Sequence, residues 1–158
     1  MLQIGDIAPD FILPSSPSEQ ISLVQFRSKP VLLVFYPADW SPVCGDQLAL
    51  YSEASDFFDE VKVQVLAISV DGKWCHVTYK EQRNLGFPLL ADFEPKGKVA
   101  KIYGVYNEQA GECERALFLI DSDGIINWSF LSDPAVVPGL DGIMEAIQRL
   151  ISKEKIVQ

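Results

Sequence analysis

The stretch Val31-Leu32-Leu33-Val34-Phe35-Tyr36 is an unbroken run of apolar, β-prone side chains. Such a run predicts a strand buried on both faces, of the kind that lies in the middle of a parallel sheet. The chain then leads from Pro37 to Cys44, and from Asp46 to about Glu60 apolar residues recur at helical spacing. A buried strand that passes through a short loop into a helix is typical of α/β proteins.

The elements predicted on either side of this strand extend the same pattern. Residues 11–13 and 21–24 predict an amino-terminal β-hairpin, and the turn Asp121-Ser122-Asp123-Gly124 predicts a second hairpin. Further strands are predicted at residues 63–70, 89–91, 115–120 and 125–130, and helices at residues 74–85, 98–103 and 140–152. The sequence therefore predicts a central mixed sheet, flanked by helices, with catalytic groups at the carboxyl ends of its central strands.

Length and charge limit the function classes. A chain of 158 residues suits one domain, residues 1–158. Its net charge of −9 argues against general binding to nucleic acid or to an anionic membrane, since both need a basic surface. The longest apolar run falls far short of the ~20 residues of a membrane helix. Residues 1–10 lack the features of a signal peptide, so we expect a cytoplasmic location.

The cysteine and histidine counts narrow the redox and metal chemistry. Cys44, Cys75 and Cys113 are too few and too far apart for a disulfide scaffold, and no CxxC motif occurs. A thioredoxin-type dithiol and a zinc knuckle therefore lack support. His76 is the one histidine, so a histidine-rich metal site is not expected either.

Position makes Cys44 the main candidate for a reactive group. It lies at or just before the first turn of a predicted helix, where free N–H groups and the helix dipole favour a thiolate. A buried, inert cysteine is an equally good interpretation of position alone. Ser41 is expected to cap the helix, or to hydrogen-bond a substrate oxygen beside the sulfur. Pro37 either stiffens the loop or simply ends the strand.

Several motifs in order along the chain resemble one family. Pro37-Ala38-Asp39-Trp40-Ser41-Pro42-Val43-Cys44 resembles the Pro-x-x-x-Thr/Ser-x-x-Cys signature of the peroxiredoxins, the AhpC/TSA family. Three further motifs are similar to those of the same family: Ile4-Gly5-Asp6-Ile7-Ala8-Pro9-Asp10-Phe11, Ser69-Val70-Asp71 with His76, and Phe87-Pro88-Leu89-Leu90-Ala91-Asp92. A last group resembles its AhpE-like, usually one-Cys, branch: Tyr103-Gly104-Val105-Tyr106-Asn107-Glu108-Gln109-Ala110-Gly111, Arg115, and Phe118-Leu119-Ile120-Asp121.

The resemblance implies a thioredoxin-like fold and thiol-dependent reduction of hydrogen peroxide and organic hydroperoxides, in antioxidant defence. Matched by position, Cys44 is the peroxidatic cysteine and Ser41 orients the peroxide. Pro37 shields the site from water, and Arg115 binds near the thiolate and the peroxide. Without the family resemblance, Arg115 is interpreted equally well as a residue that forms a salt bridge at the surface. The resemblance implies no metal, flavin, haem or other cofactor.

It also implies a thiol reductant of the thioredoxin, glutaredoxin or low-molecular-weight type, and a homodimer. Gly45 and Gln47 depart from the common family pattern, and we expect these departures to tune the activity rather than abolish it.

The residue that would resolve the cysteine sulfenic acid stays open at this point. We prefer a one-Cys mechanism with an external thiol. An internal disulfide from Cys44 to Cys75 comes next, and Cys113 would share the strand face of Arg115 if that strand reaches back far enough. A peroxide sensor or redox relay would use the same residues. A thioredoxin-fold binding module without turnover is disfavoured, because Cys44, Arg115 and Ser41 are all present.

Overall fold

The predicted central strand is β3 (Val31–Phe35), and all five of its residues are buried. In the computed structural model, which describes residues 1–157, β3 pairs in parallel with β4 (Gln64–Ser69) and antiparallel with β8 (Arg115–Ile120). β5 (Leu89–Ala91) lies beyond β4, and β9 (Ile126–Ser132) lies beyond β8. The five-stranded order β5-β4-β3-β8-β9 confirms a mixed sheet with β3 in the middle.

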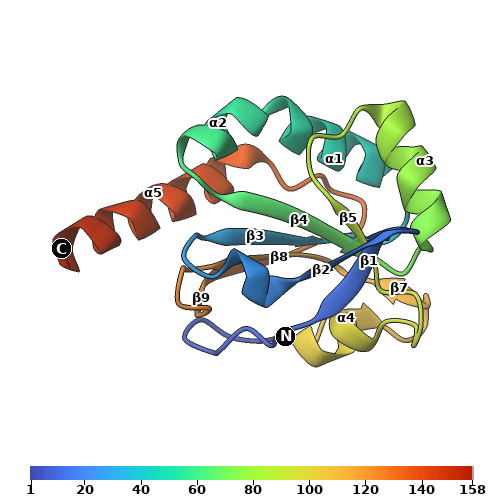
Figure 1. Ribbon diagram of the computed structural model, residues 1–158, viewed down its shortest axis with the longest axis horizontal. Helices are drawn as coiled ribbons and strands as arrows, with labels where there is room; N and C mark the ends of the chain where they lie inside the picture. Colours follow the sequence, from blue (N-terminus) through green and yellow to red (C-terminus); the bar gives the residue numbers. More distant parts are fainter. Residues whose placement is uncertain (158) are drawn as a thin grey trace.

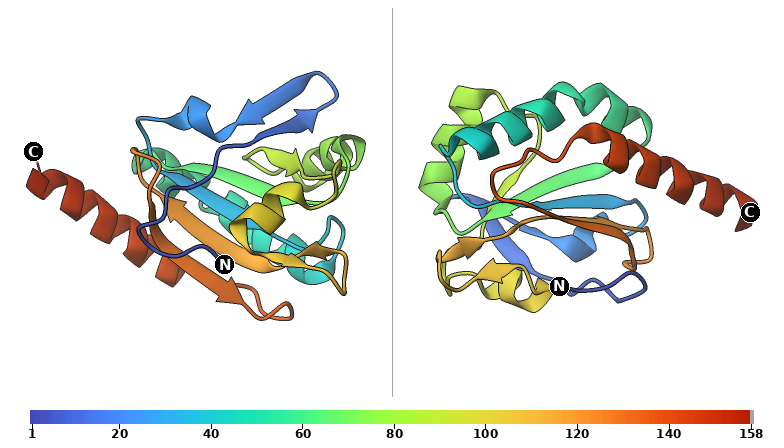
Figure 2. Two further views of the ribbon diagram at one scale, coloured as in Figure 1. Left: turned by 90° about the horizontal axis from the view of Figure 1, so that it is seen from below. Right: turned by 180° about the vertical axis from the view of Figure 1, so that it is seen from behind.

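Helices and a hairpin cover the two faces of this sheet (Figure 1). α1 (Pro42–Glu53), α2 (Ser55–Glu60) and α5 (Leu140–Val157) pack on one face, and α3 (Lys73–Arg83) adds Tyr79 to the same core. The other face carries the antiparallel hairpin of β1 (Ile12–Ser16) and β2 (Glu19–Ser22), together with α4 (Lys98–Tyr103). The last turns of α5 extend away from the body (Figure 2).

The sheet separates two hydrophobic cores. Side chains of β3 alternate between them: Leu32 and Val34 join the core under α1 and α5, and Leu33 and Phe35 join the core around α4. This alternation follows from the period of two in a β-strand, and burial of both sets explains why the strand is apolar throughout. The fold is the predicted thioredoxin-like arrangement with an amino-terminal β-hairpin.

The helix predicted from Asp46 to about Glu60 differs from the structure at its start and in its middle. It begins at Pro42, because proline fits the first turn of a helix, where its missing N–H has no partner to lose. It also breaks at Ala54 (φ −90°, ψ 12°), which separates α1 from α2. Three further elements were not predicted: the 3-10 helix Leu23–Phe26 and the short strands β6 (Tyr106–Asn107) and β7 (Glu112–Cys113).

Among residues 1–157, no helix combines the length and the apolar composition that crossing a membrane requires.

Candidate active site

Cys44 lies in the first turn of α1, directly beyond the carboxyl end of β3. Its side chain is fully buried. The first turn of a helix has N–H groups without helical partners, and the helix dipole places partial positive charge there. Cys44 thus lies between a buried strand and the first turn of a helix, where the sequence placed it.

Arg115 supplies the strongest charge at the sulfur. It begins β8, the antiparallel neighbour of β3, and its side chain is 1% exposed. Its two terminal guanidinium nitrogens donate to Cys44 Sγ at 3.5 and 3.4 Å. The structure therefore places Arg115 in contact with Cys44 and away from the surface, so its interpretation as a surface salt-bridge residue is wrong.

The guanidinium is held by neutral groups. The carbonyl oxygen of Pro134 accepts from Nε at 3.2 Å and from Nη2 at 2.9 Å, and Gln47 Oε1 accepts from Nη1 at 2.7 Å. The two ion pairs within residues 1–157 involve other side chains. Because no carboxylate neutralises Arg115, its positive charge stays available to the sulfur and to an oxygen bound beside it.

Gln47 extends this network toward the carboxyl-terminal part of the chain. It lies three residues after Cys44, on the same face of α1, and its Nε2 donates to the Tyr51 hydroxyl at 3.3 Å. Tyr51 in turn donates to the Pro138 carbonyl at 2.8 Å. Burial raises the pKa of Tyr51 to about 12, so its hydroxyl stays a proton donor. From the sequence, Gln47 was noted as a departure from the common family pattern. Its spacing of three residues from Cys44 in a helix was the available sign that it contacts the same group of residues.

Ser41 and Pro37 frame the approach to Cys44. Ser41 is the N-cap residue of α1, but its side chain makes no capping hydrogen bond, so the capping role expected for its hydroxyl is wrong. Its carbonyl accepts from the Gly45 N–H at 2.9 Å. Pro37 is buried directly after β3. The structure thus brings all the predicted site residues to one end of the central strands.

A buried polar cluster fixes the loop that carries Pro37. Asp39 accepts from the Tyr36 hydroxyl at 2.6 Å and pairs with His76 Nδ1 at 2.7 Å. His76 Nε2 lies 3.1 Å from the Leu90 carbonyl, so both ring nitrogens have a polar partner. The Asp39 N–H also donates to Asp71 at 2.9 Å. As expected, His76 packs rather than touching the sulfur.

The same cluster contains the set of groups in residues 1–157 that comes nearest to a metal site. Ligand atoms of Asp39, Asp71 and Cys75 lie within 4.8 Å of one another. Both oxygens of Asp39 are already engaged, by Tyr36 and His76, and an oxygen of Asp71 accepts from Ser69. These groups act in the hydrogen bonding of the loop.

The other two cysteines have surroundings unlike those of Cys44. Cys75 lies in the first turn of α3, and burial together with the charge of Asp39 raises its pKa to about 11. Burial also raises the pKa of Cys113 far above its usual value. Cys113 belongs to β7 and to the core around α4, on the opposite side of the sheet from Cys44. Cys113 would share the strand face of Arg115 only if that strand reached back to it, and β8 begins at Arg115, so this condition is not met.

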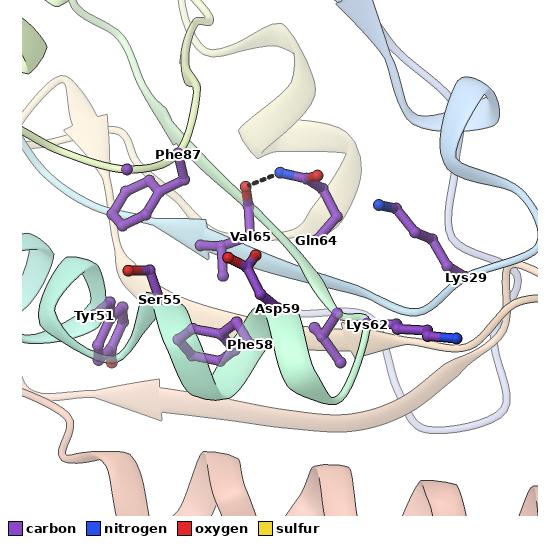
Figure 3. A pocket seen from close by; sticks show the side chains of 11 residues that line it. Lys29, Tyr51, Ser55, Phe58, Asp59, Lys62, Gln64, Val65 and Phe87 are labelled. Carbon is purple, nitrogen blue, oxygen red and sulfur yellow. Dashed lines mark hydrogen bonds between the residues drawn. The ribbon is translucent and has the colours of Figure 1, made fainter.

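A separate pocket of about 350 Å³ lies at the other end of the sheet (Figure 3). Rings of Tyr51, Phe58 and Phe87 line it, and Lys29 and Gln64 lie at its edge, near the amino-terminal ends of β3 and β4. None of the predicted site residues borders this pocket.

Comparison with known proteins agrees with this geometry. Residues 4–129 match the AhpC/TSA family. Over 138 residues the chain is 38% identical to alkyl hydroperoxide reductase E of Mycobacterium tuberculosis, covering 87% of this chain and 90% of that protein. It is 34% identical over 156 residues to peroxiredoxin-1 of Gallus gallus, covering 92% and 77%. The reduced 2-Cys peroxiredoxin of Plasmodium vivax superposes with a TM-score of 0.87 at 30% identity, covering 96% and 83%.

The fold and the site together define a thioredoxin-like protein with a buried cysteine in contact with a buried arginine. The chain belongs to the AhpC/TSA family, the peroxiredoxins, which are thiol-dependent peroxidases. The resemblance found in the sequence is thereby confirmed.

Proposed function

We propose that this protein reduces hydrogen peroxide and organic hydroperoxides with Cys44 as the peroxidatic residue. The observation that carries the proposal is the pair of guanidinium contacts at 3.5 and 3.4 Å from Sγ, made by an arginine with no carboxylate partner. The Cys44 thiolate attacks the terminal oxygen of the hydroperoxide. A sulfur–oxygen bond forms as the oxygen–oxygen bond breaks, the leaving oxygen takes up a proton, and water or an alcohol departs.

The neighbours of Cys44 have distinct roles in this step. Arg115 holds the thiolate and stabilises the negative charge that develops on the leaving oxygen. Ser41 has a hydroxyl that is not used for capping, which leaves it free to hydrogen-bond the peroxide. Pro37 is buried beside the site and keeps water from the sulfur. The reaction leaves Cys44 as a sulfenic acid, and these groups need no metal or organic cofactor for it.

We further propose that the sulfenic acid is reduced by an external thiol, in a one-Cys cycle. One thiol displaces water from the sulfenic acid to give a mixed disulfide, and a second thiol releases Cys44 and leaves as the disulfide. The surroundings of the other cysteines support this choice. A pKa of about 11 keeps Cys75 protonated at neutral pH, and Cys113 lies in the opposite core. The reductant is of the thioredoxin, glutaredoxin or low-molecular-weight type.

A homodimer and a cytoplasmic location stay predictions from the sequence. Light scattering of the purified protein measures the first, and fractionation of cells that express the chain measures the second.

The test is to mix fully reduced protein with one equivalent of hydrogen peroxide, following tryptophan fluorescence by stopped flow and weighing the product. We expect fast oxidation and the mass of one added oxygen on Cys44. The matched control is the Cys75→Ser, Cys113→Ser double variant, which should give the same rate and product. If the product of the parent chain is lighter by two hydrogens, an internal disulfide has formed, and the one-Cys cycle is wrong. A rate no faster than that of a free thiol would overturn the peroxidase assignment for Cys44.

A further inference from the structure

The two groups that hold the Arg115 guanidinium, the Gln47 amide and a carbonyl of the segment 133–139, are connected through one hydroxyl. This hydroxyl belongs to Tyr51, which lies four residues after Gln47 on the same face of α1. It accepts from Gln47 Nε2 at 3.3 Å and donates to the Pro138 carbonyl at 2.8 Å. A single buried oxygen thus joins α1 to the segment that runs from β9 to α5.

These hydrogen bonds can run in one direction only. A guanidinium has donors and no acceptor, so the Gln47 amide must turn its oxygen toward Arg115. The amide nitrogen then faces Tyr51 and needs an acceptor there. The Tyr51 hydroxyl can accept because its own proton is donated to the Pro138 carbonyl, and burial raises its pKa to about 12, which keeps that proton in place. Tyr51 therefore determines which way the Gln47 amide faces.

Tyr51 also holds the end of the segment that carries the second partner of Arg115, the Pro134 carbonyl. The first four residues of this segment, 133–136, are exposed. Within residues 1–157, the side chains of other elements that donate to its carbonyls are those of Ser132, Arg115 and Tyr51. Of these three, Tyr51 binds nearest to α5, at the buried Pro138. Its hydroxyl therefore fixes the far end of the segment.

We infer that Tyr51 is a positioning residue for the reaction at Cys44, and that it acts by fixing the two partners of Arg115. Its hydroxyl orients the Gln47 amide and anchors the segment that carries the Pro134 carbonyl. The guanidinium is thereby held at 3.5 and 3.4 Å from Sγ. Tyr51 makes no hydrogen bond to the sulfur, so its effect passes through Arg115. The inference rests on the proposed role of Cys44.

Tyr51→Phe removes the hydroxyl and keeps the ring in the core under α1 and α5. We expect oxidation of Cys44 by one equivalent of hydrogen peroxide to slow about three- to tenfold, the effect of losing one hydrogen bond that orients a catalytic group. Stopped-flow oxidation of the reduced full-length protein measures it. The rise of the rate with pH should also move to higher pH, because the reacting thiol must lose its proton and a displaced guanidinium assists this less.

Tyr103→Phe is the matched control. Tyr103 is as fully buried as Tyr51, and its hydroxyl also donates to a proline carbonyl, that of Pro9, at 2.6 Å. It lies in the core on the opposite side of the sheet from Cys44. Both variants should lose thermal stability, but Tyr103→Phe should keep the rate and the pH profile of the parent chain. An equal loss of rate in the two variants would reduce the effect to stability and overturn the inference, as would a parental rate and pH profile in Tyr51→Phe.

A second background shows whether Tyr51 acts through Arg115. Arg115→Lys already lacks the fork that reaches both Gln47 and the Pro134 carbonyl. Adding Tyr51→Phe to it should therefore change the rate by less than about twofold, since residues that act through one another are not additive. The full loss in this background would make Tyr51 independent of Arg115 and contradict the inference. A parent chain that reacts no faster than a free thiol would instead contradict the proposed function itself.

Discussion

Cys44 and Cys113 are equally buried and lie on opposite sides of the same sheet, yet their surroundings differ in kind. Cys44 has a guanidinium at hydrogen-bond distance and the first turn of a helix around it. Cys113 lies in an apolar core, where burial and the charges of nearby carboxylates, Asp92 first among them, raise its pKa. The comparison teaches that burial alone does not make a cysteine inert. Its chemistry depends on which charges are buried with it.

The largest difference is expected when each of these sulfurs is removed. Cys44→Ser should abolish peroxide consumption, because the hydroxyl that replaces the thiol is a poor nucleophile near neutral pH. Cys113→Ser should keep the parent rate and lose only stability. Peroxide consumption by each variant, with thermal unfolding as a check on the fold, measures the contrast. Equal loss in both variants would remove the distinction between the two sites.

The second largest effect on the oxidation rate is expected from Arg115, whose positive charge is present at Cys44 and absent at Cys113. Arg115→Lys keeps a positive charge but loses the fork that reaches Sγ, Gln47 and the Pro134 carbonyl together. We expect oxidation of Cys44 to slow by about a hundredfold, the usual effect of losing an oxyanion-binding donor. Stopped-flow oxidation measures it, and circular dichroism confirms that the fold is retained. A rate within twofold of the parent would make Arg115 a structural residue.

Gln47→Glu tests whether the absence of a neutralising carboxylate matters. The new carboxylate would stand where an oxygen now lies 2.7 Å from Arg115, and the resulting pair would compete with the sulfur for the guanidinium. We expect about a tenfold slower oxidation at neutral pH, equivalent to about 1.4 kcal/mol of lost transition-state stabilisation. Thiolate absorbance, followed as the pH is varied, reports the same change independently. Gln47→Met, similar in size but uncharged, separates the loss of the hydrogen bond from the added charge.

The smallest predicted effect concerns Cys75 and its pH dependence. Alkylation requires the thiolate, and the pKa of Cys75 is raised from 9.0 to about 11 in the folded protein. A raised thiol pKa means less thiolate at any pH below it, so native Cys75 should react slowly until the pH approaches 11. In denaturant the same residue should react readily near its ordinary pKa of about 9. Mass mapping after brief alkylation across this range measures the shift, and rapid native labelling near pH 8 would contradict it.

Local patterns predicted the elements well where a single property dominated. The apolar run of β3, the short strand β5 and the helix α4 were all placed from their own residues. The break at Ala54 was missed because alanine favours helix and the apolar spacing continues on both sides of it. The strands β6 and β7 have two residues each, too few to show any periodicity.

Some residues of the site were predicted and others were missed, because only some of them are marked by a local pattern in the sequence. Cys44 became a candidate from its position between a strand and a helix, which is local, and its expected role came from the resemblance to the family. The contact of Gln47 with Arg115 joins residues 68 apart in the chain, and it exists only once β8 lies beside β3. The packing of α3 against Gly45 of α1 likewise joins distant parts of the chain, which no pattern in either helix reveals.

The loop from Tyr36 to Ser41 has one further consequence, which concerns temperature. Asp39 joins it to β3, to α3 and to the end of β4 through Tyr36, His76 and Asp71. The ordering of the loop therefore occurs when the chain folds and is not repeated at each encounter with peroxide. We expect the activation entropy of Cys44 oxidation to be no more unfavourable than a simple bimolecular encounter requires, and to become more negative in Asp39→Asn.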